Sequence, residues 1–218
     1  MSYSEYSGGG ISPKTGSIIS KSLPMDGRRS WQVTTPPAIE PVTLTDLKIF
    51  AKIEYNDEDY LLENFIKSAR LSAEQYCGRA FIEQSITMKM GYWPSDVIEL
   101  VKPPLISITK IATLDEDDVE TVYSSDNYYI IKEATPGKLV LKKNASAPIN
   151  TSRDYGGYLV EYKAGYGDAA ADVPISIIEA IKLWASVAQA TRIIDPKNPP
   201  PEVRATLDLF KIRGVIIR

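Results

Sequence analysis

The hydrophobic period of this chain changes twice, and these changes constrain its fold more than any other feature. Apolar residues recur at helical spacing before Gly78, alternate with polar residues over 79–166, and return to helical spacing from Pro174. A segment of period two between helical segments predicts an inserted, mostly antiparallel β subdomain. Two N-terminal and two C-terminal helices must meet to bury their apolar faces, so we expect an α+β fold built on a small helical bundle.

Two helices are predicted before the β segment. Thr43 and Asp46 have the spacing of a capping box, and the apolar stripe behind them ends near Ile53. For the second helix, Asn56 and the acidic residues after it predict a cap, and Gly78 predicts a left-handed end. A calcium loop is the alternative for this acidic start, but the glycine and distal glutamate of an EF-hand are missing.

Within the β segment, Ile86, Met88, Met90 and Tyr92 alternate with Thr87, Lys89 and Gly91, which predicts a strand with one buried face. Further strands are expected at Ile98–Val101, Leu105–Leu114, Val119–Tyr123, Tyr128–Lys132, Lys138–Leu141 and Tyr158–Lys163. The run Asp115–Asp118 is interpreted as a solvated hairpin loop, with a metal site as the alternative. The many tyrosines of this segment fit either cross-strand packing or a protein-contact surface.

The C-terminal part begins with Pro174, which suits a first helical position, and continues into a broad apolar face over Ile177–Ala188. We expect this face to pack on the first two helices, on a neighbouring subunit, or on both. After a proline-rich break, a short helix is predicted from Glu202 to about Ile212. An apolar and basic tail, Lys211–Arg218, follows it.

These patterns divide the chain into five parts. They are a flexible N-terminal arm (1–40), a helical part (41–78), the β subdomain (79–166), C-terminal helices that complete the helical part (167–212) and a docking tail (213–218). The Ser/Gly-rich start of the arm cannot compensate its ordering entropy by burying apolar surface. Trp31, Val33 and Ile39 favour an arm that orders on a neighbouring subunit, the alternative being a disordered tail.

Composition excludes several classes of chemistry. The chain has no histidine and one cysteine, Cys77, so a histidine base, a disulfide and a cysteine-based zinc site are all excluded. We interpret Cys77 as a packing residue. No phosphate loop or nucleophile motif is present, and a net charge of −3 argues against sequence-independent DNA binding. We therefore predict no catalytic, metal-binding or cofactor-binding residue, and no apolar run is long enough to span a membrane.

Several blocks of the sequence resemble a known family. They are Pro37–Leu44 before a short helix, the helix end Glu74–Ala80, Pro103–Leu105 before a strand, Tyr162–Asp168, and Asp172–Pro174 before an apolar helix. Their order is similar to that of the head–tail connector (adaptor) proteins of long-tailed bacteriophages and gene transfer agents. The resemblance covers about residues 31–218, and the block Ala164–Gly167 followed by Val173–Pro174 is its most specific part.

The resemblance implies a structural protein of the virion neck, made in the cytoplasm of a bacterial host. It implies a ring, expected to be dodecameric, that docks below the portal protein, extends the DNA channel, and offers a platform to a stopper, tail terminator or other tail-side connector. Packaged DNA would pass through without sequence-specific binding, and no membrane is involved. Two alternatives are a carboxylate-based hydrolase of the virion and a small DNA-binding regulator.

Contact residues are predicted within this frame. The portal-docking tail consists of Lys211, Ile212, Arg213, Gly214, Val215, Ile216, Ile217 and Arg218. It is short and β-prone. Because it follows a proline-rich break, little of the core of its own chain is left for its apolar residues to pack on, so they need another surface. The alternative is that the tail packs on its own helical part. Contacts between subunits are predicted at Trp31, Val33, Ile39, Ile177, Ile181, Trp184 and Ala188.

Overall fold

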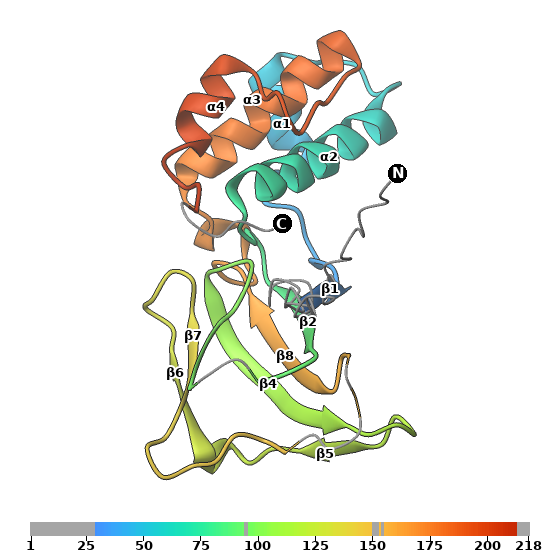
Figure 1. Cartoon of the computed structure of the whole chain (residues 1–218). Coiled ribbons are helices and arrows are strands. Elements are labelled where there is room, and N and C mark those ends of the chain that lie inside the picture. Colours follow the sequence, from blue (N-terminus) through green and yellow to red (C-terminus); the bar gives the residue numbers. More distant parts are fainter. Residues whose placement is uncertain (1–28, 94–95, 150–152, 154, 213–218) are drawn as a thin grey trace, which may run out of the picture.

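The computed structural model describes residues 29–93, 96–149, 153 and 155–212. Its helices are α1 (Leu44–Ala51), α2 (Asp59–Cys77), α3 (Ile175–Thr191) and α4 (Pro201–Leu207). Its strands are β1 (Arg29–Thr35), β2 (Gln84–Met90), β3 (Val97–Glu99), β4 (Leu105–Leu114), β5 (Glu120–Val122), β6 (Tyr128–Ile131), β7 (Lys138–Leu141) and β8 (Tyr158–Ala164). The helices form one layer at one end of the molecule and the strands form the other end (Figure 1). The predicted α+β class is confirmed.

The strands form two antiparallel sheets. The larger sheet has the order β1-β2-β8-β4-β5, and the smaller one has the order β3-β7-β6. Each of the seven strands predicted within the β segment is present, with ends shifted by one or two residues at most positions. The predicted buried face of β2 is confirmed for Ile86, Met88 and Met90, but Thr87 on the other face is buried as well and Tyr92 lies beyond the end of the strand.

Helix α1 begins as its sequence predicts. The backbone N–H of Asp46 donates to Oγ1 of Thr43 at 3.1 Å, and the backbone N–H of Thr43 donates to the Asp46 carboxylate at 3.3 Å. The Thr43 hydroxyl also donates to that carboxylate at 2.7 Å, and these bonds hold the pKa of Asp46 below its usual value. The capping box therefore satisfies backbone N–H groups that the first turn cannot pair internally.

Helix α2 departs from its prediction at one end. Its N-cap residue is Glu58, which makes no side-chain capping bond, so the prediction that Asn56 caps the helix is wrong. The Asn56 side chain instead accepts a bond from Nζ of Lys48, which also pairs with Asp59 at 2.7 Å. The other end is confirmed, since Gly78 adopts the left-handed conformation with φ 71° and its N–H bonds to the carbonyl of Glu74.

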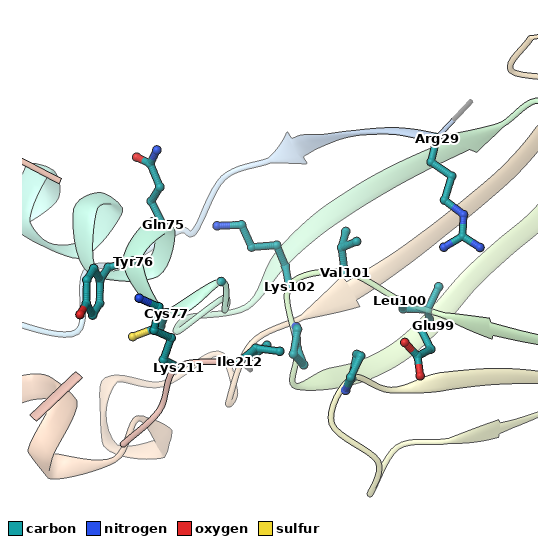
Figure 2. A pocket seen from close by; sticks show the side chains of 13 residues that line it. Arg29, Gln75, Tyr76, Cys77, Glu99, Leu100, Val101, Lys102, Lys211 and Ile212 are labelled. Atoms are coloured by element: carbon teal, nitrogen blue, oxygen red, sulfur yellow. The ribbon is translucent and has the colours of Figure 1, made fainter. Parts of the chain in front are cut away.

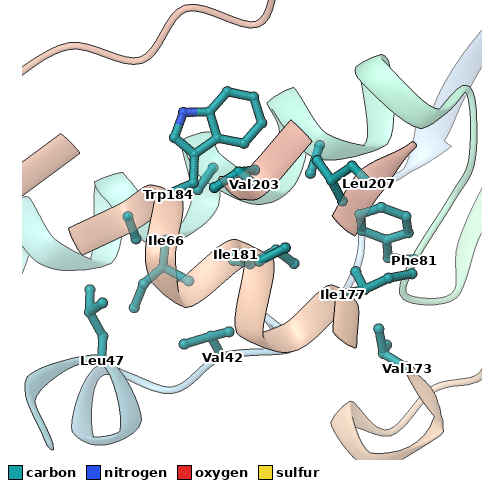
Figure 3. Close-up of a cluster of buried hydrophobic side chains, with 14 of the residues drawn as sticks. Val42, Leu47, Ile66, Phe81, Val173, Ile177, Ile181, Trp184, Val203 and Leu207 are labelled. Carbon is teal, nitrogen blue, oxygen red and sulfur yellow. The ribbon is translucent and has the colours of Figure 1, made fainter. Parts of the chain in front are cut away.

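Helix α3 lies at the centre of the helical part (Figure 3). Its buried face includes Ile177, Ile181 and Trp184, and it packs on α1, α2 and α4. The same cluster contains Leu47 of α1, Ile66 of α2, and Val203 and Leu207 of α4. Helices from both sides of the β segment thus share one core, as the change of period predicts. Helix α4 is shorter than predicted, ending at Leu207.

Strand β1 corrects the prediction for the N-terminal arm. Its residues pair with β2 of the same chain, with Trp31 opposite Met88 and Val33 opposite Ile86. The expectation that Trp31 to Ile39 become ordered only on a partner is therefore wrong for this strand. Alternating Trp31 and Val33 gave a period-two signal that suits an edge strand. Residues 1–28, the rest of the predicted arm, lie outside the described residues.

The return from the sheet to the helices passes through a close backbone crossing. Gly165 has φ 138°, and a Cβ there would lie 2.6 Å from the backbone N of Glu83. The N–H of Gly165 donates to the carbonyl of Pro104, and the N–H of Tyr166 donates to that of Phe81. Only glycine fits this position, which explains part of the Gly-Tyr-Gly block.

Candidate interaction surfaces at the waist

The helical part and the larger sheet meet at a waist, which we define as residues 74–83, 100–104 and 210–212. A buried ionic network lies beside it. Arg70 of α2 donates to Glu40 through Nε at 2.6 Å and through Nη2 at 3.2 Å. Its Nη1 donates to Glu74 at 2.9 Å, and Arg70 and Glu74 are each only 2% exposed. The network fastens the segment after β1 to helix α2.

Glu74 extends this network into the β part. Its Oε1 accepts the backbone N–H of Phe81 at 2.8 Å and the side-chain amide of Gln84 at 3.1 Å. Burial raises the pKa of Glu74, and the charge of Arg70 acts against this rise. Burial also opposes the charge of Arg70, but Glu40 and Glu74 together more than compensate, so the pKa of Arg70 lies above its usual value. The carboxylate of Glu74 thus links α2 to the start of β2.

Next to the network, the waist contains a pocket of about 340 Å³ (Figure 2). We call it the waist pocket. Its walls are residues of the α2 C-terminus, of the segment between β3 and β4, and of the end of the described chain. Three cationic residues line it, namely Arg29, Lys102 and Lys211. The one carboxylate residue of its lining, Glu99, pairs with Lys138 at 3.4 Å outside the lining.

Lys102 is the most enclosed of these cations. Its backbone has φ 57°, and its Nζ lies 5.5 Å from the ring centroid of Trp31. Burial lowers the pKa of Lys102, although the charge of Glu74 nearby acts against this. The side chain makes no ion pair with any described residue, so the ring of Trp31 is its main close partner.

The end of the described chain also lies at the waist pocket. Nζ of Lys211 lies 4.2 Å from the ring centroid of Tyr76, and the N–H of Ile212 donates to the carbonyl of Cys77 at 3.0 Å. The first two residues of the predicted docking tail thus contact their own chain. The remaining tail residues, 213–218, lie outside the described residues, so tail docking stays a prediction.

Cys77, the single cysteine, lies at the base of this region. It is buried, and its thiol donates to the carbonyl of Leu207 at 3.5 Å. Burial raises the pKa of Cys77 to about 12, so the reactive thiolate is disfavoured. The interpretation of Cys77 as a packing residue is confirmed.

The predicted subunit contacts divide into two groups. Ile177, Ile181, Trp184 and Ala188 are buried within their own helical part, so the prediction that they contact a neighbouring subunit is wrong. The broad apolar face of α3 is explained by three partner helices within the chain. Val33 and Ile39 are exposed and Trp31 is partly so, and their contact with a neighbour stays a prediction.

Other apolar side chains are available for contacts on the helical part, and one of them, Ile49, corrects the prediction that it belongs to the buried apolar stripe of the first helix. Ile49 of α1 is 73% exposed and Leu209, after α4, is 80% exposed. Ile193, after α3, is also largely exposed. For Ile193 and Leu209 the only sequence signal is an apolar residue outside a buried stripe, which is common on protein surfaces.

The run Asp115–Asp118 forms the exposed turn between β4 and β5. Oδ1 of Asp115 accepts the backbone N–H of Asp117 at 3.0 Å and that of Val119 at 2.9 Å. Asp118 pairs with Arg153 at 2.6 Å. The hairpin interpretation is confirmed, and no group of carboxylates arranged for a metal ion occurs among the described residues.

Four tyrosines, Tyr123, Tyr128, Tyr158 and Tyr162, serve packing within the β part. Tyr158 and Tyr162 are buried, and the hydroxyl of Tyr162 donates to the carbonyl of Val101 at 3.0 Å. The rings of Tyr123 and Tyr128 stack with centroids 6.3 Å apart. Tyr129 is exposed and remains available for a contact.

No helix in the described parts of the chain is long and apolar enough to cross a membrane.

Comparison with known proteins shows a family similarity over part of the chain. Residues 41–127 match the profile of the phage gp6-like head-tail connector proteins. Over these residues, less than half of the chain, the sequence is similar to the head–tail connector family. The matched segment starts just before α1, spans α2 and continues through β5. The resemblance inferred from the sequence blocks is confirmed, and a search of curated proteins gives no match.

Solved structures share this fold over most of the chain. A chain in the neck of an empty gene transfer agent (GTA) particle, computed with C6 symmetry, aligns with a TM-score of 0.73 at 17% identity, covering 86% of this chain and 97% of that one. A chain in the virion of a native GTA particle aligns with a TM-score of 0.72 at 17% identity, with 85% and 97% coverage. A third, in the neck of a native GTA particle computed with C12 symmetry, gives 0.67 at 17% identity, with the same coverage.

Proposed function

We propose that this connector is a structural head–tail adaptor of a tailed phage or phage-like particle. It forms a ring below the portal protein, extends the DNA channel and offers an attachment platform to the tail. The family match over residues 41–127 carries this proposal, and a fold shared with chains of particle necks over 86% of the length supports it. A neck computed with C12 symmetry suggests a dodecamer.

The helical part is proposed to form the ring wall. The apolar face of helix α3 is covered by other helices of the same chain. The contacts between copies therefore come from side chains that the helical core leaves exposed. Ile49, Ile193 and Leu209 are such side chains, and Val33 of β1 and Ile39 after it are also exposed, with Trp31 partly exposed. A ring needs two different patches on each copy, because its contacts are head-to-tail.

The tail Lys211–Arg218 is proposed to dock on the portal. Lys211 and Ile212 hold its start at the waist, and Gly214 allows the chain to bend away from there. Val215, Ile216 and Ile217 can then add as a strand to a sheet edge, where main-chain bonds give affinity. On the tail side of the ring, a stopper or tail terminator is the proposed partner.

We propose no catalytic role for this connector. Burial raises the pKa of Glu74, but Arg70, Phe81 and Gln84 all hold its carboxylate by hydrogen bonds. A carboxylate so restrained is a structural group rather than a free acid for hydrolysis. The net charge of −3 also fits a channel through which DNA passes without adhering, and it disfavours a DNA-binding regulator.

Deletion of Gly214–Arg218 tests the adaptor role at its portal contact. Docking predicts a folded subunit with a near-normal melting temperature that does not bind portals, so that DNA-filled heads accumulate without tails. The matched control replaces Lys142 and Lys143, exposed cations outside the tail, by glutamine and should leave attachment intact. Full portal occupancy by the truncated subunit would contradict the tail assignment.

A further inference from the structure

The waist pocket has the charge of a site for an acidic group. Arg29, Lys102 and Lys211 line it, and none of them forms an ion pair with a described residue. Glu99, the carboxylate of the lining, is already paired with Lys138. The rings of Trp31 and Tyr76 hold two of the ammonium groups near the pocket. An incoming carboxylate would therefore meet several cations that form no ion pair with the described residues of their own chain.

The shape and chemistry of the pocket select among possible occupants. About 340 Å³ suits a few side chains and excludes a nucleic acid duplex. Its walls also include the apolar residues Leu100, Val101 and Pro103, which favour a polypeptide over a free anion. The tail of the same chain carries Arg213 and Arg218, and these charges would be repelled. The occupant that fits is an acidic loop.

This chain itself presents such a loop at Asp115–Asp118. Two of its carboxylates are used locally, Asp115 by backbone N–H groups and Asp118 by Arg153. The side chains of Glu116 and Asp117 are exposed and bond to no described residue. Beside the loop, Val119 is 58% and Val122 64% exposed, so apolar surface accompanies the charge.

The loop and the pocket lie at different ends of the sheet. The β4–β5 hairpin is at the end remote from the helices, whereas the waist pocket adjoins them (Figure 1). A loop so placed does not reach the pocket of its own chain. Two complementary patches at separate places on one subunit give a head-to-tail contact, the type that closes into a ring.

We propose that the acidic loop Asp115–Asp118 of one copy docks in the waist pocket of the next copy in the ring. This inference rests on the proposed adaptor function and assigns one contact of its ring. The carboxylates of Glu116 and Asp117 meet the cations of the pocket, and Val119 and Val122 cover apolar surface beside it.

A charge-swap experiment tests the contact. The purified full chain is studied at low salt by sedimentation velocity over a range of concentrations, with negative-stain images of the same samples. The pocket variant is Arg29→Glu/Lys211→Glu, and the loop variant is Glu116→Lys/Asp117→Lys. Each should weaken self-association at least about tenfold, because like charges then face each other. The combined variant has both charges reversed and should recover most of the loss.

A control and defined outcomes separate this contact from the adaptor function. The control variant is Lys142→Glu/Lys143→Glu, which changes the net charge as much as the pocket variant does. Neither lysine lines the pocket, so this variant should leave self-association unchanged. Rings that form equally well in both reversed variants would overturn the contact and leave the adaptor function standing. A combined variant that fails to recover association would also overturn it, since the pocket would then serve a different partner. A wild-type chain that does not self-associate, either alone or after mixing with the portal of its particle, would overturn both.

Discussion

Replacing Arg70 by methionine should destabilise the connector more than any surface substitution. The change removes the cation between Glu40 and Glu74 but keeps an unbranched side chain of similar length. Glu74 then remains buried without its counter-ion, while Phe81 and Gln84 still hold it in place. Breaking a buried pair in this way costs about 3 kcal/mol of unfolding free energy. For a domain of this size, the melting temperature should fall by roughly 6–12 °C.

The dependence on pH gives this prediction a second readout. Burial already raises the pKa of Glu74, and loss of Arg70 raises it further. A folded state with a raised carboxyl pKa binds its proton more tightly than the unfolded state, so its stability is greater at low pH and falls as pH rises through that pKa. The deficit of Arg70→Met relative to wild type should therefore be largest at neutral pH and shrink on acidification. Urea unfolding at a series of pH values measures it.

Two further variants make the reasoning refutable. Arg70→Met/Glu74→Gln removes both charges and keeps an acceptor for the N–H of Phe81, so it should be more stable than Arg70→Met alone. Lys138→Met is the control, because it removes the partner of Glu99 from an exposed pair and should cost less than about 1 kcal/mol. The proposed role of the network would be refuted if Arg70→Met lost less than about 1 kcal/mol of unfolding free energy. It would also be refuted if the double variant were no more stable than Arg70→Met.

Three other substitutions test local parts of the fold, each by denaturant unfolding. Trp184→Ala should cost about 3–5 kcal/mol of unfolding free energy, because it leaves a large cavity in the helical core. A smaller loss accompanied by failed ring assembly would instead favour a role between subunits. Thr43→Ala should cost about 1 kcal/mol through the capping box, and an unchanged stability would show that the box contributes nothing. Gly165→Ala should cost at least about 2 kcal/mol, since its Cβ would meet the backbone of Glu83; a tolerated alanine would show that the crossing relaxes.

Local signals predicted most of the fold. The alternation of β2, the capping box at Thr43 and the left-handed Gly78 depend on neighbouring residues, so the sequence contains all the information they need. Asn56 failed as a cap because Lys48, from another helix, binds its side chain. Local propensity fails where a side-chain atom that would cap a helix is instead bonded to a residue from another element.

Contacts between distant segments were harder to predict. The breadth of the α3 face gave no way to choose between partners within the chain and partners in a ring, and three helices of the chain cover it. The waist pocket combines Arg29, Lys102 and Lys211, which the sequence spreads over the whole described chain. One signal was present for the ionic network. Arg70 and Glu74 interrupt an apolar helical stripe four residues apart, a spacing that places opposite charges together.

Electron microscopy of the purified chain, alone and after mixing with the portal of its particle, tests most directly whether it forms a head–tail adaptor ring. We expect rings with an open central channel wide enough for a DNA duplex, and we expect these rings to cap the portal. Single subunits or closed particles without a channel, in both samples, would contradict this expectation.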